Sequence, residues 1–95
     1  MSWFVYVARC ADASLYCGIA RDIAARIAEH DAGKGAKYTR GRGPLVVVLS
    51  RRCRTQGNAL RIEHAFKQLT RAQKEALVIA PRARVDALAR RALRA

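Results

Sequence analysis

The chain has 95 residues, of which 52% are hydrophobic, and it carries 19 Lys and Arg against 7 Asp and Glu, a net charge of +12. This length predicts one domain with a modest core, and the apolar residues form no run of about 18 that would span a membrane. The positive charge, mostly arginine, predicts a polyanionic partner, and nucleic acid is favoured because the arginine fork binds phosphate oxygens in pairs.

The three cysteines lack the spacing of zinc ligands, and an odd number cannot all pair within one chain. We therefore expect reduced thiols that pack as small hydrophobes in the cytoplasm. The first ten residues alternate like a strand and show no basic leader before their apolar stretch, so secretion is not expected.

The first expected element is a strand over residues 3–10, because aromatic and β-branched residues alternate there with a period of two. A polar turn over residues 11–14 precedes a second apolar run at residues 15–19, which predicts an antiparallel hairpin. Tyr6 and Tyr16 then stand in neighbouring strands. The register, which the sequence leaves open, decides whether the two rings share a face.

A helix is expected next, with Asp22 as its N-cap and its end near Gly33. Two isoleucines four residues apart mark its buried stripe. At 100° per residue, Arg26 and His30 lie on the shoulder of that stripe, so we expect them to line the edge of a cleft.

Residues 34–44 form a loop rich in glycine and positive charge. We expect its cations to follow a phosphate backbone while its tyrosine stacks on a base or sugar; an ordinary mobile loop is the alternative. The residues assigned to nucleic acid here are Lys34, Lys37, Tyr38, Arg40 and Arg42. The apolar run at residues 45–49 then predicts a central strand covered on both faces.

Two further helices are expected before Pro81 breaks the chain. The first opens at residues 55–58 and places Glu63 on the shoulder of its apolar stripe; a capping box of Thr70 and Gln73 opens the second. A last amphipathic helix, residues 82–94, carries arginines on its polar face. The stripe of the first helix contains Ala59, Ile62, Phe66 and Leu69; that of the last contains Val85, Leu88, Ala89, Ala92 and Leu93, opposite Arg82, Arg84, Arg90, Arg91 and Arg94.

The order of the expected elements is β-β-α-β-α-α-α. It predicts an α+β domain over residues 1–95 with its core in about residues 1–80 and its helices on a small three-stranded sheet.

This order and these residues resemble the GIY-YIG nuclease family over about the first 80 residues. The family's two short motifs correspond to residues 5–7, Val-Tyr-Val, and residues 16–18, Tyr-Cys-Gly. The helix with Arg26 and His30 follows, and a later helix carries the acidic residue Glu63. The runs at residues 33–41 and 69–77 resemble most closely the short stand-alone YhbQ-like branch of that family.

The resemblance implies a metal-dependent endonuclease with one Mg²⁺ or Mn²⁺ ion on Glu63. Arg26 would clamp the scissile phosphate. Tyr16, and with it Tyr6, would orient or deprotonate the attacking water if neighbouring cations lower the phenol pKa, while His30 would serve as base or relay. The division of labour between Tyr16 and His30 stays open.

Each site residue also has a structural alternative. The tyrosines are compatible with ordinary sheet aromatics, Arg26 and His30 with an exposed pair, and Glu63 with an i,i+4 ion pair to Lys67. Glu29 and Asp31 are interpreted as solvated charges. Gly18 is expected where the backbone approaches substrate or another strand closely.

The implied activity is on DNA, with branched, nicked or flapped forms preferred and a role in repair or recombination. The first rival is a non-catalytic nucleic-acid-binding module with the same fold. The second is a nuclease subunit whose protein partner supplies recognition. No membrane partner is expected, and the choice between DNA and RNA and the oligomeric state stay open.

Overall fold

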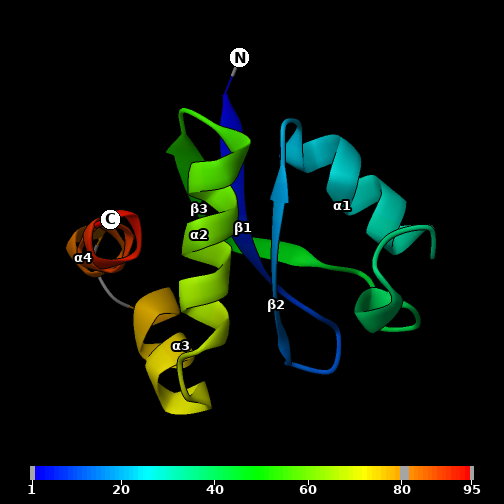
Figure 1. Cartoon of the computed structure of the whole chain (residues 1–95). Coiled ribbons are helices and arrows are strands. Elements are labelled where there is room, and N and C mark those ends of the chain that lie inside the picture. Colours follow the sequence, from blue (N-terminus) through cyan, green and yellow to red (C-terminus); the bar gives the residue numbers. More distant parts are fainter. Residues whose placement is uncertain (1, 80–81, 95) are drawn as a thin grey trace.

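The computed structural model describes residues 2–79 and 82–94 and places a three-stranded antiparallel sheet among helices (Figure 1). The elements in chain order are β1 (Trp3–Arg9), β2 (Leu15–Ala20), α1 (Ile23–Asp31), the 3₁₀ helix η1 (Lys37–Thr39), β3 (Val46–Cys53), α2 (Gln56–Lys67), α3 (Arg71–Ile79) and α4 (Arg82–Leu93). This succession confirms the predicted α+β order. Pro81 and the side chains of Arg82 and Arg84 lie outside the described residues.

The central strand is β1, which pairs with β2 on one side and β3 on the other. Its alternation sorts Val5 and Val7 onto the face covered by α2 and α4, and Tyr6 onto the face toward α1. Tyr6 lies opposite Gly18, and Ala8 lies opposite Tyr16. The register therefore puts Tyr6 and Tyr16 on the same face of the sheet.

Strand β3 is an edge strand, so the prediction of a central strand at residues 45–49 was wrong. Val46 is 61% exposed and Val47 37% exposed, although both belong to the apolar run. Such a run reports average hydrophobicity but does not say which strand pairs on both sides. The centre goes instead to β1, where four consecutive residues are buried.

The predicted helix starts are confirmed by their caps. The Asp22 carboxylate accepts a hydrogen bond from the amide of Ala25 at 3.0 Å, and the Thr55 hydroxyl accepts one at 3.0 Å from the amide three residues on. Thr70 and Gln73 form the reciprocal capping box, with bonds of 2.9 and 3.2 Å. Satisfying these free amides fixes where α1, α2 and α3 begin.

The larger core lies between the sheet, α2 and α4, and the smaller one lies under α1. The predicted stripes are buried at Ala59, Ile62 and Phe66 of α2, while Leu69 is half-buried just beyond the helix. Burying one large apolar side chain contributes about 1.5–3 kcal/mol. On α4 the predicted stripe is buried or half-buried, and Arg90, Arg91 and Arg94 are exposed. All three cysteines are free and buried, as expected.

Among the helices in the described ranges, none is both long and apolar enough to cross a membrane.

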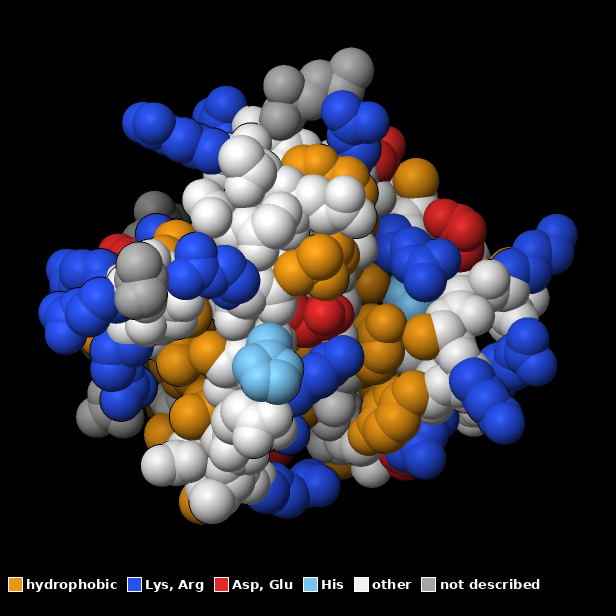
Figure 2. All heavy atoms as spheres, in the orientation of Figure 1, with side chains coloured by type: hydrophobic (Ala, Val, Ile, Leu, Met, Phe, Trp, Pro, Cys, Tyr) orange, Lys and Arg blue, Asp and Glu red, His pale blue; other side chains and the backbone are white. Residues whose placement is uncertain are grey.

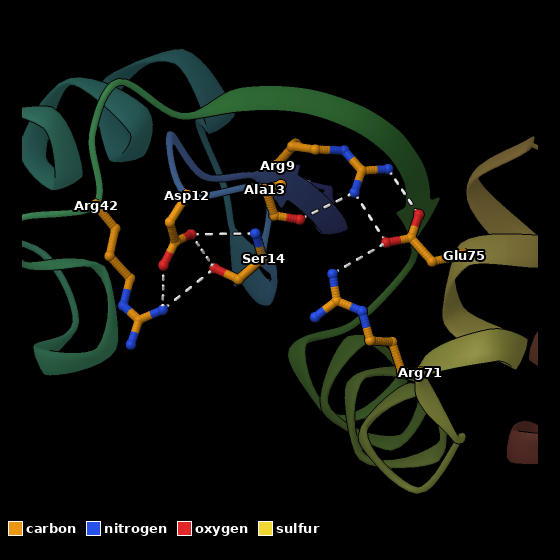
Figure 3. A network of polar contacts seen from close by, with 7 residues as sticks. All are labelled: Arg9, Asp12, Ala13, Ser14, Arg42, Arg71 and Glu75. Atoms are coloured by element: carbon orange, nitrogen blue, oxygen red, sulfur yellow. Dashed lines mark hydrogen bonds and ion pairs between the residues drawn. The ribbon is translucent and has the colours of Figure 1, made fainter.

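Two ion pairs connect the β1–β2 hairpin to distant parts of the chain (Figure 3). At the end of β1, Arg9 makes a bidentate ion pair with Glu75 of α3, at 2.8 and 2.9 Å. In the turn, Asp12 accepts a hydrogen bond of 2.6 Å from Arg42 of the loop at residues 34–44, called the basic loop below. These half-exposed pairs contribute little to stability, and they join α3 and the basic loop to the β1–β2 hairpin.

Candidate functional site

The candidate site lies at the free edge of β2, where α1 approaches from one face of the sheet and α2 from the other (Figure 1). The rings of Tyr6, Tyr16 and His30 lie with their centroids 5.0–6.4 Å apart. Arg26 of α1 and Glu63 of α2 both act electrostatically on the Tyr16 phenol. The structure thus gathers Tyr6, Tyr16, His30 and Arg26, and it places Glu63 on α2 near enough to Tyr16 to act on its phenol.

His30 is buried, with 1% of its surface exposed. Its Nε2 lies 2.9 Å from the Tyr6 hydroxyl and its Nδ1 lies 2.7 Å from the Thr39 hydroxyl. Thr39 donates its own proton to the Ala36 carbonyl at 2.8 Å, so its oxygen accepts from Nδ1–H. The Ala36 amide reaches Nδ1 only at 3.4 Å, so the shorter bonds decide the tautomer. Nε2 is then the acceptor for the Tyr6 proton.

The burial of His30 corrects two expectations, because the ring neither lines an open cleft edge nor forms an exposed pair with Arg26. Burial and then the Arg26 charge lower its pKa, outweighing Glu29 and Asp31, so the imidazole is neutral at neutral pH. The ring fits because residue 35 is glycine: a Cβ there would overlap the imidazole. Gly35 and Thr39 therefore hold the His30 ring in place. The sequence did not predict either role, because glycine and threonine are common in any loop.

The two phenols keep their protons. Burial raises the pKa of Tyr6, and the neighbouring Tyr16 raises it further. Burial also raises the pKa of Tyr16, and Glu63 adds to that rise. Arg26 lowers the pKa of both phenols but does not outweigh burial, so Arg26 alone does not activate them. Tyr6 and Tyr16 are thus suited to orienting a water molecule, and His30 is the better base.

Gly18 faces both tyrosines on the sheet. A Cβ at this position would lie 2.8 Å from the Tyr6 hydroxyl oxygen and 2.9 Å from Cε2 of Tyr16. The predicted close approach is present, and its neighbours are these two rings. Glycine here lets the Tyr6 and Tyr16 side chains fold over the strand.

Arg26 lies on α1 one turn before His30 and is one-third exposed at its side chain (33%). Its guanidinium is 3.4 Å from Glu29, an i,i+3 contact that is long and solvent-accessible. Pairs of this kind contribute little. The guanidinium also lies close to the Tyr6 and Tyr16 hydroxyls and lowers the pKa of both phenols, so Arg26 faces the tyrosines with one-third of its side chain exposed.

Glu63 has a side chain that is 18% exposed, and one carboxylate oxygen lies 3.6 Å from the Lys67 ammonium. The ordinary i,i+4 pair is thus present, and the same carboxylate lies near enough to β2 to raise the pKa of Tyr16 and of Cys17. In residues 2–79 and 82–94 no group of three or more His, Cys, Asp or Glu side chains could hold a metal ion. One part-buried carboxylate fits Mg²⁺, which takes one or two carboxylates and completes its shell with waters and substrate phosphate.

The basic loop is tied to the site through Tyr38. This ring stacks on Tyr16, with centroids 5.8 Å apart and planes 27° apart, and the Arg42 guanidinium lies 4.4 Å from its centroid. Arg42 in turn pairs with Asp12 (Figure 3). The loop's other cations, Lys34, Lys37 and Arg40, are exposed.

The loop is also anchored at its far end, because the Asp31 carboxylate accepts a hydrogen bond of 2.9 Å from the Leu45 amide. Asp31 therefore has a structural partner beyond the solvated charge that was expected. Thr39, inside the loop, is 1% exposed. The segment between α1 and β3 is thus held at both ends and in its middle.

The surface of this side of the molecule shows an acidic side chain at its centre, with Lys and Arg side chains around it and at its rim (Figure 2). Hydrophobic side chains lie between them. Such an arrangement attracts a polyanion to the rim and leaves a carboxylate at the centre.

Comparison of the chain with known proteins identifies its family. The family model described as the GIY-YIG catalytic domain matches residues 2–76. A UPF0213 protein of Cronobacter sakazakii is 51% identical over 76 residues, which cover 80% of this chain and 80% of that protein. A UPF0213 protein of Vibrio cholerae is 49% identical over 87 residues, covering 90% and 85% of the two chains.

Among solved structures, the chain is similar to the UPF0213 protein from Bacillus halodurans, determined by solution NMR. The two share 44% sequence identity with a TM-score of 0.55, over 83% of this chain and 84% of that one. The matched region contains the β2 edge, α1 and α2, which carry the candidate site. The chain therefore belongs to the GIY-YIG family, in the branch of the UPF0213 proteins.

Proposed function

We propose that this protein is a metal-dependent endonuclease that hydrolyses phosphodiester bonds in DNA. Its targets would be branched, nicked or flapped forms that arise in repair and recombination. The observation that supports this most is that Arg26 and Glu63 both act on the Tyr16 phenol of β2, beside the hydrogen-bonded pair of Tyr6 and His30. The net charge of +12 supports a polyanionic substrate.

The chain's own residues divide the work by their chemistry. Arg26 binds the non-bridging oxygens of the scissile phosphate and stabilises the charge that develops there. The Tyr6 hydroxyl donates to His30 Nε2, so a water bound at the Tyr6 oxygen can lose its proton along this hydrogen bond. Tyr16 orients the same water. A Mg²⁺ or Mn²⁺ ion held by Glu63 would supply Lewis-acid stabilisation of the phosphoryl oxygens.

The test is the cleavage of labelled single-stranded, duplex, flap and four-way-junction DNA, with Mg²⁺, Mn²⁺ or EDTA, by the wild-type protein and by Glu63→Gln. We expect cutting that requires metal and falls about 100-fold or more in the variant, while DNA affinity stays within about twofold. Asp86→Asn, which removes one carboxylate charge at the opposite edge of the sheet, is the matched control and should cut normally.

Equal cleavage by the wild type and Glu63→Gln would reject the metal-site assignment. Binding without cleavage in either protein would favour the non-catalytic module, because Glu63 would then serve only as the partner of Lys67. Cleavage that begins only when a second protein is added would favour the partner-dependent subunit.

A further inference from the structure

A groove continues from the candidate site along the free edge of β2. It consists of two hollows of about 240 and 140 Å³, which share Leu15, Tyr38 and Lys74 in their linings. The first hollow begins at Tyr16, and the second reaches Ser14 in the β1–β2 turn. The groove therefore leads away from the catalytic side chains in one direction, along the strand.

The lining of the groove shows that it follows the edge itself. Neighbouring side chains of a strand point to opposite faces, so Leu15 and Cys17 face α2 while Tyr16 faces α1. All three line the first hollow. The Tyr38 ring forms one wall, and the facing wall comes from α2 and α3, with Phe66, Lys67, Arg71 and Lys74.

The charges along this wall are predominantly positive. The one carboxylate in the lining, Glu75, is held by Arg9 at 2.8 and 2.9 Å and lies 3.8 Å from Arg71 (Figure 3). The Lys74 ammonium lies 5.7 Å from the centre of the Phe66 ring, and within the described part of the chain it has no ion pair. A half-buried ammonium over a ring, beside a neutralised carboxylate, fits a phosphate group.

The size of the groove limits what it can hold. Each hollow is smaller than the roughly 300–1,000 Å³ of an ordinary pocket for a drug-sized ligand. The Tyr38 ring is 45% exposed, and its stacking on Tyr16 and contact with Arg42 place it along one side of the groove. Hollows of about 240 and 140 Å³ cannot enclose a duplex, so an unpaired strand is the form of DNA that could enter them.

From the position, charge and small volume of this groove, we infer that it binds an unpaired DNA strand next to the scissile phosphate, with its phosphates toward Lys67, Arg71 and Lys74. The inference rests on the proposed function and adds its substrate class: DNA with a single-stranded end or flap adjoining the cleaved bond. Lys67 also faces Glu63, so it would mark the point where the groove meets the catalytic side chains.

The experiment measures binding in EDTA, so that no cleavage occurs, by fluorescence anisotropy. The three probes are a single strand, a blunt duplex and the same duplex with a single-stranded extension. The variant is Arg71→Gln with Lys74→Gln; Lys67 is left intact because it pairs with Glu63. The matched control, Arg52→Gln with Arg90→Gln, removes the same charge near the β3 edge and α4.

We expect the groove variant to bind the single strand and the extended duplex about tenfold more weakly, and the blunt duplex within about twofold of wild type. The slope of log affinity against log salt for the single strand should fall by about 0.7 for each phosphate that the variant no longer neutralises. The control should change all three affinities by the same small factor. Unchanged circular dichroism and melting temperature would show that both variants are folded.

An equal loss on the blunt duplex would overturn the inference, because the groove would then bind phosphates of any DNA form. Unchanged single-strand affinity, or an equal loss in the control, would overturn it as well. These outcomes are independent of catalysis. If no DNA is cut but the groove variant loses only single-strand affinity, the proposed nuclease activity fails while the groove assignment stands.

Discussion

The two free edges of the sheet differ in chemistry, although both are bordered by helices. The β2 edge lies between α1 and α2 and gathers tyrosines, a buried histidine, an arginine and a carboxylate. The β3 edge borders a larger hollow of about 800 Å³, whose lining contains one ion pair, Arg51 with Asp86 at 2.8 Å, and exposed or half-buried valines. The candidate site is thus not at this larger hollow.

This difference teaches that helix placement, more than cavity size, determines where chemistry can assemble. At β2, helices approach from opposite faces, so side chains from both faces meet around the strand edge. At β3, the α2 and α4 face is covered, while Val47, Ser50 and Arg52 on the other face remain exposed. Of the two edges, the β2 edge is therefore the one at which helices on both faces of the sheet border a polar cluster.

The largest expected effect separates the arginines of the two edges. Arg26→Gln should lower cleavage of flap DNA by about 10²–10³-fold, because a donor aimed at the developing charge is lost. Arg52→Gln, at the β3 edge, removes the same charge and should leave cleavage within about twofold. Single-turnover rates at saturating protein would measure both, and equal losses would contradict a site confined to the β2 edge.

One added methyl group at Gly35 should disrupt the packing around the His30 ring. Gly35→Ala would push a Cβ into the imidazole, and we expect about 1–3 kcal/mol of lost stability from overpacking. Gly57→Ala, where the nearest atom to a new Cβ is 3.9 Å away, is the control. It should stabilise α2 by about 0.5–1 kcal/mol, because alanine favours the helix. Urea unfolding would measure the stability of both variants. If Gly35→Ala left the free energy of unfolding unchanged, the loop would have to shift enough to make room for the methyl group.

Loss of the hydrogen bond that orients His30 should cost less stability than disruption of the packing around its ring. Thr39→Val removes the hydroxyl acceptor and leaves the buried Nδ1 without its shortest partner, so we expect a loss of about 1–2 kcal/mol. Ser50→Ala, at an exposed position of β3, should change stability by less than about 0.5 kcal/mol. The same urea series compares them. A Thr39→Val protein as stable as wild type would contradict the assigned tautomer.

The smallest effect is a pH dependence confined to the β2 side. Because the folded-state pKa of His30 lies below its ordinary value of about 6.5, the unfolded chain binds more protons in acid. This contribution to stability is complete above about pH 6.5 and is lost as the pH falls through the folded-state pKa. His30→Gln should reduce this loss of stability at acid pH, whereas His64→Gln, at an exposed position of α2, should leave it unchanged. Melting temperatures between about pH 4.5 and 8 would reveal the difference.

Sequence reasoning predicted most elements because their signals are local. The caps at Asp22, Thr55 and Thr70 each need only residues three positions apart, and the alternation in β1 needs only its own residues. The apolar run in β3 was misread as central because strand order depends on pairing with distant residues. The burial of His30 was missed for the same reason, since it is produced by Gly35 and Thr39 of a separate loop.

The sequence by itself determined the α+β succession, the basic character of the surface and the residue types available for chemistry, because these follow from composition, periodicity and short-range caps. The tertiary structure alone decided that Tyr6 and Tyr16 share a face, that β2 rather than β3 is the edge enclosed by two helices, and that Arg26 and Glu63 act on the same phenol. Each of these depends on strand register and helix docking, which are settled by contacts between residues far apart in the chain.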